Sequence, residues 1–166
     1  MWYVIQTTAG HEEAVRKEAS IMIPDADFRI IYRVGKYNYK GKWVCRKKIM
    51  FTGYIFVVTD HIDTVVSDIW KISDFAKPVK LGDDFVPISD EEQKFLECLT
   101  GNDETIEESI GFIYGDEIRV TEGPLKGFES RIVRIDRHKR LAYIEFDMGT
   151  RKIETQLCLN VLEKKR

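Results

Sequence analysis

The sequence predicts a mixed α+β domain followed by a small β-barrel. Up to about residue 100, β-rich segments alternate with short amphipathic helices, which is typical of the α+β class. Residues 101–109 are polar and acidic without any period, as expected for a linker. Beyond them, short alternating strands are separated by turn sequences, a pattern that favours a barrel. We therefore expect a domain over residues 1–100, a linker over 101–111 and a barrel over 112–166.

Three short helices are predicted in the first region. The clearest follows Ser89, whose hydroxyl can cap the helix while Glu92 reaches back, as in a capping box. A second helix is predicted over residues 10–20. A third is predicted to begin at Asp60, where Asp63 completes a pattern similar to the capping box. The residues expected on the buried faces are Ala14, Val15, Ala19, Val65, Val66, Ile69, Trp70, Phe95, Leu96 and Leu99.

The β-rich runs between these helices are expected to form an antiparallel sheet flanked by the helices. Two of the runs are joined by residues 35–41, whose glycines and asparagine suit the tip of a hairpin. The predicted strands cover residues 1–7, 28–34, 42–49, 54–59 and 75–81.

In the run from Lys47 to Val58, Gly53 interrupts an apolar strand. A glycine at such a place indicates a bulge or a close backbone approach. Strand alternation puts Tyr54, Phe56 and Val58 on one face and Ile55 and Val57 on the other, so both faces are apolar. The strand is therefore either buried on both sides or covered by a partner.

The composition excludes several classes of protein. Hydrophobic residues make up 43% and charged residues 33%, which excludes a wholly disordered chain. No apolar run approaches the ~20 residues of a membrane span, and the N-terminus lacks the features of a signal peptide. We expect a monomer of the cytoplasm that has no membrane partner.

The sequence suggests no metal, cofactor or enzymatic site. The cysteines lie far apart without a Cys-x-x-Cys pair, and no histidine has a second ligand at metal spacing. The segment "GPLKGFES" lacks the Gly-Lys-Ser/Thr end of a phosphate-binding loop, and no nucleophile–base set is suggested by spacing. The residues considered are Cys45, Cys98, Cys158, His11, His61 and His138.

The charges are segregated along the chain. Residues 29–48 carry eight basic side chains and no acidic one, residues 83–117 are strongly acidic, and residues 118–166 are again net basic. Two basic surfaces that flank an acidic middle suggest a polyanion partner. In the first of them, Tyr32, Tyr37, Tyr39 and Trp43 alternate with the cations and could stack on unpaired bases. The alternative is a solvated hairpin whose aromatic side chains pack back on the sheet.

Four blocks occur in order along nearly the full chain: "WYV" at the start, "FTGYIFV", "PISDEE" and "GDEIRVTEGPLKGFE". With these blocks the chain resembles the NusG family of transcription elongation factors. The last block resembles a KOW motif, the opening segment of an SH3-like barrel. The resemblance implies a NusG-type N-terminal domain, an acidic linker and a KOW barrel.

Within that family the chain looks most like a specialised paralog of the LoaP type, a group of processive antiterminators. The long basic hairpin and three departures from the general pattern support this interpretation. The departures are Thr52 before "GY", Ser130 in the KOW block and Met148 before Gly149. In housekeeping members that barrel loop contacts the termination factor Rho or a ribosomal protein, so Met148 argues against both partners.

The resemblance also implies the residues of two interfaces. In NusG-type factors an apolar aromatic surface grips the clamp helices of RNA polymerase, a helix-in-groove mode of recognition. The residues implied for polymerase binding are Tyr3, Phe51, Gly53, Tyr54, Phe56 and Ser67. The residues predicted to bind a structured RNA hairpin are Arg33, Lys36, Lys40, Lys42, Arg46, Lys47, Lys48, Lys126, Arg131, Arg134, Arg137, Lys139, Arg140, Arg151 and Lys152.

The expected function is therefore transcription elongation and antitermination, with readthrough of terminators. Two alternatives remain at this point: a ribosome-associated KOW protein that binds RNA, and a general housekeeping factor of the same family. An exposed apolar groove around Phe51 and Tyr54 would distinguish the first alternative, because a pure RNA binder has no use for it.

Overall fold

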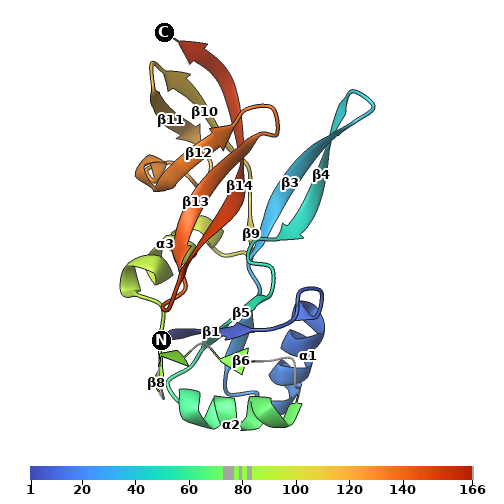
Figure 1. The fold of residues 1–166 in the computed structure, drawn as a ribbon. Helices are drawn as coiled ribbons and strands as arrows, with labels where there is room; N and C mark the ends of the chain where they lie inside the picture. The colour runs from blue at the N-terminus through green and yellow to red at the C-terminus, as the bar shows by residue number, and fades with distance from the viewer. Residues whose placement is uncertain (73–76, 79, 82–83, 166) are drawn as a thin grey trace. The chain divides into compact units, whose positions relative to one another are not determined.

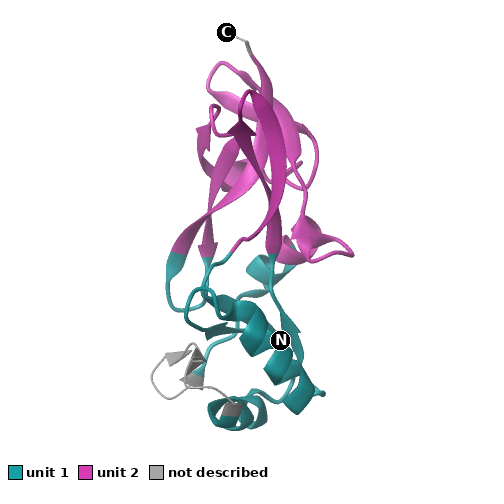
Figure 2. Cartoon of the chain, turned by 90° about the vertical axis from the view of Figure 1, so that its right-hand side faces the viewer, with its two compact units in different colours: residues 1–31, 51–94, 147–152 teal, residues 32–50, 95–146, 153–166 magenta. Residues whose placement is uncertain are grey.

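The computed structural model describes residues 1–72, 77–78, 80–81 and 84–165 (Figure 1). The chain forms two compact units, shown in separate colours in Figure 2. The first contains residues 1–31, 51–94 and 147–152, and the second contains residues 32–50, 95–146 and 153–166. The predicted α+β class is confirmed. The units group the basic hairpin with the C-terminal strands, whereas the predicted domain boundaries, drawn in sequence order, stay a prediction.

The first unit is built on a four-stranded sheet in the order β2-β5-β1-β6. Each neighbouring pair is antiparallel, and β5 lies in the interior with Phe56 opposite Val4. The central strands read as apolar runs because they are buried on both faces. The strands are β1 (Trp2–Gln6), β2 (Asp27–Arg29), β5 (Tyr54–Val58) and β6 (Lys77–Pro78), and a separate two-stranded ribbon contains β7 (Lys80–Leu81) and β8 (Asp84–Phe85). Of the strand predicted over 75–81, residues 75, 76 and 79 lie outside the described residues.

Helices α1 (Glu12–Met22) and α2 (Ile62–Ile72) pack against each other, and α1 also contacts β2 and β5 (Figure 1). Both helices begin two residues later than predicted. Two predicted core positions are wrong: Ala14 is exposed and Trp70 is 51% exposed. The buried face of α1 instead includes Glu12, because two backbone amides compensate its carboxylate. None of the described helices is long and apolar enough to cross a membrane.

Helix α3 (Asp90–Thr100) begins where the sequence predicts. The hydroxyl of Ser89 accepts a hydrogen bond of 3.2 Å from the backbone amide of Glu92, which confirms the predicted N-cap. The three apolar residues predicted on its inner face are all buried, with at most 3% exposure. The pattern succeeded here because cap and apolar spacing indicate the same helix.

The interpretation of Gly53 as an interruption within one apolar strand is wrong, whereas the separate strands predicted over residues 42–49 and 54–59 agree with β4 and β5 to within one residue. Strand β4 ends at Ile49 and β5 begins at Tyr54, and the two strands belong to different sheets. The residues between them form a turn in which the amide of Tyr54 donates to the carbonyl of Phe51. Gly53 has φ +85° in this turn, a conformation that strongly favours glycine, so it marks the turn and not a bulge. An added Cβ would lie 3.2 Å from the backbone oxygen of Thr7, so the predicted close backbone approach is confirmed.

The second unit contains the basic hairpin. Strands β3 (Tyr32–Tyr39) and β4 (Lys42–Ile49) pair antiparallel over their full length, and β9 (Thr105–Ile106) adds to β3 in parallel. The turn contains only Lys40 and Gly41, both with positive φ, and is therefore shorter than the predicted tip over 35–41. The extra strand length follows from the alternation of cations and aromatic residues, which continues the strand pattern to Tyr39.

The remainder of the second unit is a five-stranded sheet in the order β11-β10-β14-β13-β12, which matches the predicted barrel segment. Buried residues of β13 and β14, together with Leu125, provide much of its core. A 3-10 turn (Glu129–Arg131) precedes β12. The strands are β10 (Ser109–Tyr114), β11 (Glu117–Glu122), β12 (Ile132–Asp136), β13 (Leu141–Asp147) and β14 (Lys152–Lys165).

The predicted linker over 101–111 contains ordered structure. It includes β9 and the first residues of β10, and the backbone amide of Tyr32 donates to the carbonyl of Glu104 at 2.9 Å. The low apolar content that suggested a linker is compensated by main-chain pairing with the hairpin, which needs no particular side chain.

Candidate functional site

The residues predicted to bind RNA polymerase lie in the first unit. Phe51, Tyr54 and Phe56 are buried, with exposed fractions of 2%, 7% and 0%. The ring centroids of Phe51 and Phe56 lie 5.3 Å apart in an edge-to-face arrangement. Tyr3 is half-buried on β1 and Ser67 is exposed on α2. In the described structure these aromatic residues therefore belong to the core, and their role in polymerase binding stays a prediction.

Tyr54 has an unusual environment for a buried tyrosine. Its hydroxyl has no hydrogen-bond partner among the described residues, although buried tyrosine hydroxyls usually find one. The guanidinium of Arg151 lies 5.5 Å from the centre of its ring. Arg151 belongs to the segment 147–152 between β13 and β14, which groups with the first unit. At 7% exposure, Tyr54 points into the core of the first unit.

Met148, in the same segment, is completely buried, and its backbone amide donates to the carbonyl of Arg151 at 2.9 Å. The next residue, Gly149, has φ +95° and lies against Val86. The side chain that departs from the usual family pattern is therefore a packing residue here, with no surface to offer a partner.

The residues predicted to bind RNA fall mostly in the second unit, but Arg151 and Lys152 group with the first. On the hairpin, cations lie over aromatic rings: Lys47 over Tyr32 at 4.0 Å and Arg46 over Tyr37 at 5.4 Å. Tyr37 and Tyr39 remain exposed to 38% and 57%. The hairpin therefore presents charge and aromatic surface together, and only part of its aromatic content is packed away.

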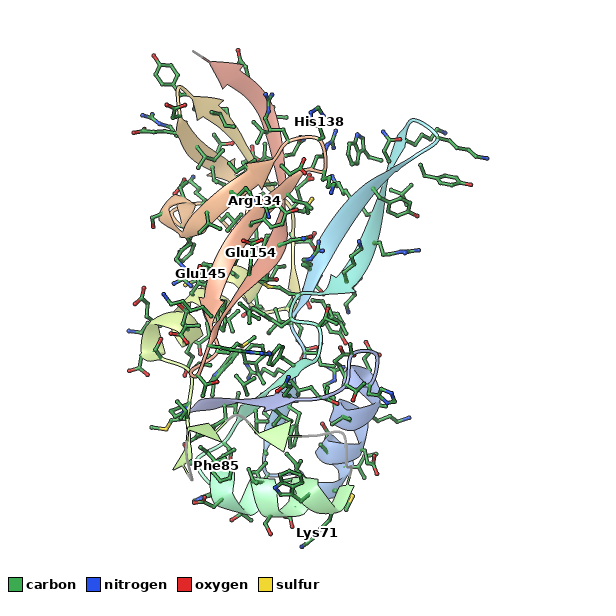
Figure 3. All side chains as sticks on the ribbon, viewed as in Figure 1. Lys71, Phe85, Arg134, His138, Glu145 and Glu154 are labelled. Carbon is green, nitrogen blue, oxygen red and sulfur yellow. The ribbon has the colours of Figure 1, made fainter. Side chains whose placement is uncertain are left out.

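The cations of the five-stranded sheet differ in how far they are already paired. Arg134 donates to Glu154 at 2.9 Å (Figure 3) and also lies 3.6 Å from the centre of the Tyr143 ring. Its pKa is raised, chiefly by that hydrogen bond. Arg131 lies over the ring of Phe95 at 4.2 Å. Arg137, Lys139 and Lys126 are exposed.

A pocket of about 340 Å³ lies within the second unit, along β3 and beside the β12–β13 turn. We call it the hairpin pocket. Its lining includes four cations that the sequence predicted as RNA-binding and two aromatic residues that alternate with them. They are Arg33, Lys36, Lys48, Lys139, Tyr37 and Trp43. The pocket thus unites residues far apart in the sequence in one concave, basic site.

Sequence reasoning missed the other five lining residues, of which His138, Asn38 and Gln156 are polar and Gly35 and Leu141 are not. His138 lies on the β12–β13 turn (Figure 3). No periodic signal could have found these residues, because each reaches the pocket through the contact between hairpin and sheet and not through local spacing. The stacking of Arg140 on Trp43, with 4.0 Å between guanidinium and ring centre, belongs to that contact.

Lys36 belongs to a small, partly buried network. Its amine donates to Glu108 Oε1 at 2.7 Å, and this hydrogen bond raises the pKa of Lys36. The thiol of Cys158 donates to Glu108 Oε2 at 3.2 Å. Burial, followed by the hydrogen bond to Glu108, raises the pKa of Cys158 to about 12. Lys36 is therefore neutralised by Glu108, and the net charge of the pocket comes from the other cations.

Within the described residues, no group of three or more His, Cys, Asp or Glu side chains could hold a metal ion. Three acidic residues lie in the first turn of α3, where they complement the helix dipole, and Glu108 in the segment after the helix is the partner of Lys36.

The fold and the site together define a class of two-unit proteins. One unit is mixed α+β, and in the other a basic hairpin lies beside a five-stranded sheet. Residues 1–97 match the family described as "Transcription termination factor nusG". Because the match covers more than half of the 166 residues, the chain belongs to the NusG family. Members of this family are transcription factors that bind RNA polymerase.

Similar proteins agree with this assignment. The transcription termination/antitermination protein NusG of Halalkalibacterium halodurans is 28% identical, covering 98% of this chain and 97% of that protein. The protein of the same name from Thermus thermophilus is 28% identical over 81% of this chain and 82% of its own length. A solved structure described as "Domain interaction in Thermotoga maritima NusG" has a TM-score of 0.56 at 23% identity, covering 96% of this chain and 93% of that one. The last likeness concerns the fold.

Proposed function

We propose that this protein is a cytoplasmic transcription elongation factor of the specialised, LoaP-like kind, which binds RNA polymerase and a leader RNA hairpin and promotes readthrough of terminators. The family match and the names of the relatives support a role in elongation. The observation that carries the specialised part is the basic hairpin of β3 and β4, which has seven cations over residues 32–49, no acid and partly exposed aromatic rings.

Polymerase binding is proposed for the first unit, through the residues that the family resemblance implies. Ser67 is exposed on α2 and Tyr3 half-exposed on β1, so they can touch a partner without rearrangement. Three of the implied residues, Phe51, Tyr54 and Phe56, are buried and would support this surface from the core. If the segment 147–152 moved away from Tyr54, they would become part of the surface. Residues at the core of an interface are commonly aromatic, which fits this set.

RNA binding is proposed for the second unit. Two of the cations that line the hairpin pocket, Lys48 and Lys139, are exposed, and Arg46 lies over the ring of Tyr37, which also lines it. Lysine and arginine supply the phosphate contacts that dominate affinity, while exposed rings stack on unpaired bases. Arg134 contributes less than its neighbours, because Glu154 already neutralises it.

A ribosome-associated RNA-binding protein is the rival of a different class, and a general NusG factor the rival within the family. Contact with Rho or a ribosomal protein through the β13–β14 segment is doubtful for this chain, because Met148 is fully buried there. The match over residues 1–97 favours a transcription factor over the ribosomal alternative, since that region precedes the KOW segment.

In vitro transcription through an intrinsic terminator distinguishes these functions. The purified full chain is added to templates with and without a leader hairpin upstream of the terminator. A specialised factor increases readthrough only with the hairpin, and a general factor affects both templates equally. No effect on either template, with the homologous polymerase, would contradict the proposed function.

The polymerase interface is tested with Ser67→Arg, which places a bulky cation on the proposed surface. Ser20→Arg is a matched control, because Ser20 is also exposed on a helix of the first unit but lies outside the proposed surface. Ser67→Arg should reduce capture of the polymerase, and Ser20→Arg should leave it unchanged. Equal capture by both variants would remove α2 from the interface.

A further inference from the structure

We propose that the hairpin pocket binds one unpaired nucleotide of an RNA, with its phosphate on Arg33, Lys48 and Lys139 and its base against Trp43 and Tyr37. The inference rests on the proposed RNA binding and adds to it a specific site and a specific feature of the ligand. It predicts that the protein distinguishes an RNA with an extrahelical base from a fully paired one.

The volume of the pocket limits the ligand to a small one. At about 340 Å³ it lies near the lower end of the roughly 300–1,000 Å³ of small-molecule sites. A base stacked within a duplex cannot enter such a recess, whereas a bulged or looped base can leave the stack and do so. The size therefore favours a single nucleotide over a length of helix.

Arg33 is the strongest indication of an anionic ligand. It is only 9% exposed, and within the described part of the chain its one side-chain hydrogen bond goes to Gln156 Oε1 at 3.4 Å. Burial lowers the pKa of its guanidinium below the usual value, so the desolvated charge is only partly compensated. A phosphate can accept two of the remaining N–H donors in a bidentate arrangement.

The other two cations proposed to bind the phosphate also lack an acidic partner. Lys48 and Lys139 form no ion pair with any described residue, whereas Lys36 is held by Glu108. Lys48 lies directly opposite Arg33 on the hairpin, so the two charges share one face. Three cations without an acidic partner around one recess repel one another, and an anion relieves this repulsion.

The base has an aromatic platform and polar groups to read it. Trp43 is 36% exposed, and the guanidinium of Arg140 already stacks on its ring. A base that stacks on Trp43 would extend this stack. The edge of β3 beyond Arg33 has no strand partner other than β4 among the described strands, since β9 pairs only with Tyr32 and Arg33. Main-chain groups along this edge are therefore available to the base edge.

Gly35 allows a test that changes no charge. It lies on the pocket wall, and an added Cβ would meet Lys48 Cδ at 3.1 Å and Arg33 Nη1 at 3.4 Å. Both are parts of flexible side chains, and Gly35 lies in a β-strand that favours valine. Gly35→Val should thus fill the recess while the strand and the number of cations stay the same.

The probes are two RNA hairpins that differ by a single nucleotide: in one a 2-aminopurine is bulged, and in the other an added uridine opposite pairs with it. The full-length wild-type chain should bind the bulged hairpin about tenfold more tightly and change its 2-aminopurine fluorescence. Gly35→Val should lose this preference and bind both hairpins as the wild type binds the paired one. Circular dichroism and thermal melting verify that the variant is folded.

A charge-matched pair completes the test. Lys139→Ser removes a pocket cation, and Arg119→Ser removes an exposed cation on β11 outside the pocket. Only the first should reduce the preference for the bulge. If the wild type binds both hairpins equally, or if Gly35→Val weakens both equally, the pocket inference is wrong while RNA binding stands. If neither hairpin binds at low salt, the proposed RNA binding fails with it.

Discussion

The carboxylate of Glu12 holds the glycine of the turn before β5: its Oε1 accepts a 2.7 Å hydrogen bond from the backbone amide of Gly53. The other oxygen accepts from the amide of Gly10 at 2.8 Å, and the side chain is 2% exposed. One acid at the start of α1 thus fastens two loops at one end of the sheet. The positive φ of Gly53 is stabilised by this contact and by the bond from the amide of Thr7 to the Gly53 carbonyl.

Glu12→Ala should therefore destabilise the protein more than the same substitution of a glutamate on the surface. It leaves two amides without their acceptor, one of them buried, which costs about 3 kcal/mol of unfolding free energy. Glu12→Gln should cost less, because one acceptor oxygen remains. Urea unfolding of each variant gives the comparison, and Glu18→Ala, on the exposed side of the same helix, should stay within about 0.5 kcal/mol of the wild type. Equal losses for Glu12→Ala and Glu18→Ala would contradict this role.

Tyr54→Phe should leave the protein as stable as the wild type or more stable by about 1 kcal/mol. The variant removes a buried hydroxyl that has no partner among the described residues, and such a group carries a desolvation cost without a compensating bond. Thermal melting measures the effect. A loss of more than about 1 kcal/mol would mean that the hydroxyl has a bound partner, such as water.

The same residue shows why a truncation is a poor test of polymerase binding. At 7% exposure, Tyr54→Ala would open a cavity and cost roughly 3–5 kcal/mol, so loss of binding would be ambiguous. Tyr54→Phe keeps the ring. If polymerase capture depends on the hydroxyl, it falls for Tyr54→Phe while stability does not.

The sequence predicted those elements whose local and tertiary signals agree. The cap at Ser89 and the apolar face of α3 are examples, because each rests on contacts within a few residues. The buried carboxylate of Glu12 could not be predicted, since the amide that satisfies it comes from Gly53, far along the chain. The role of glycine was recognised at position 53, but the change of sheet there depends on long-range pairing and has no local sign.

The candidate site divides in the same way. The cations were found from composition, which records charge without position. Their ion pairs could not be predicted. Glu154 neutralises Arg134 and Glu108 neutralises Lys36, and neither acid is near its partner in the sequence. The burial of Phe51 and Tyr54 was left open by strand alternation, because a strand with two apolar faces fits a core and an interface equally well.

Cys158 should resist alkylation at pH 8, while Cys45 and Cys98, which are exposed, react. Burial raises the pKa of the Cys158 thiol to about 12 from an ordinary value of 9.0, so almost none of it is thiolate at pH 8. Mass spectrometry after a short iodoacetamide pulse identifies the modified sites. Modification of Cys158 as fast as Cys45 in the folded chain would contradict its burial.

The same shift predicts an alkaline effect on stability. Because the pKa of Cys158 is higher in the folded chain than in the unfolded one, its contribution is fully present below pH 9 and is lost as the pH rises toward 12. The unfolding free energy of the wild type should therefore fall more steeply above pH 9 than that of Cys158→Ala. Parallel curves for the two proteins would show that the thiol titrates alike in both states.

RNA affinity should depend steeply on salt, and the ion pairs of the structure determine which cations matter. If about six phosphates are neutralised, the logarithm of the affinity falls against the logarithm of the salt concentration with a slope near −4. Lys48→Ser should make this slope shallower by about 0.7, because Lys48 has no ion pair among the described residues. Arg134→Ser should change it less, because Glu154 already compensates that guanidinium and a phosphate would have to displace it. Fluorescence anisotropy with a labelled leader hairpin between 50 and 300 mM salt, roughly the range in which such slopes are linear, measures all three. A slope near zero for the wild type excludes phosphate contacts as the basis of binding, and equal changes for the two variants would show that the Arg134–Glu154 pair opens when RNA binds.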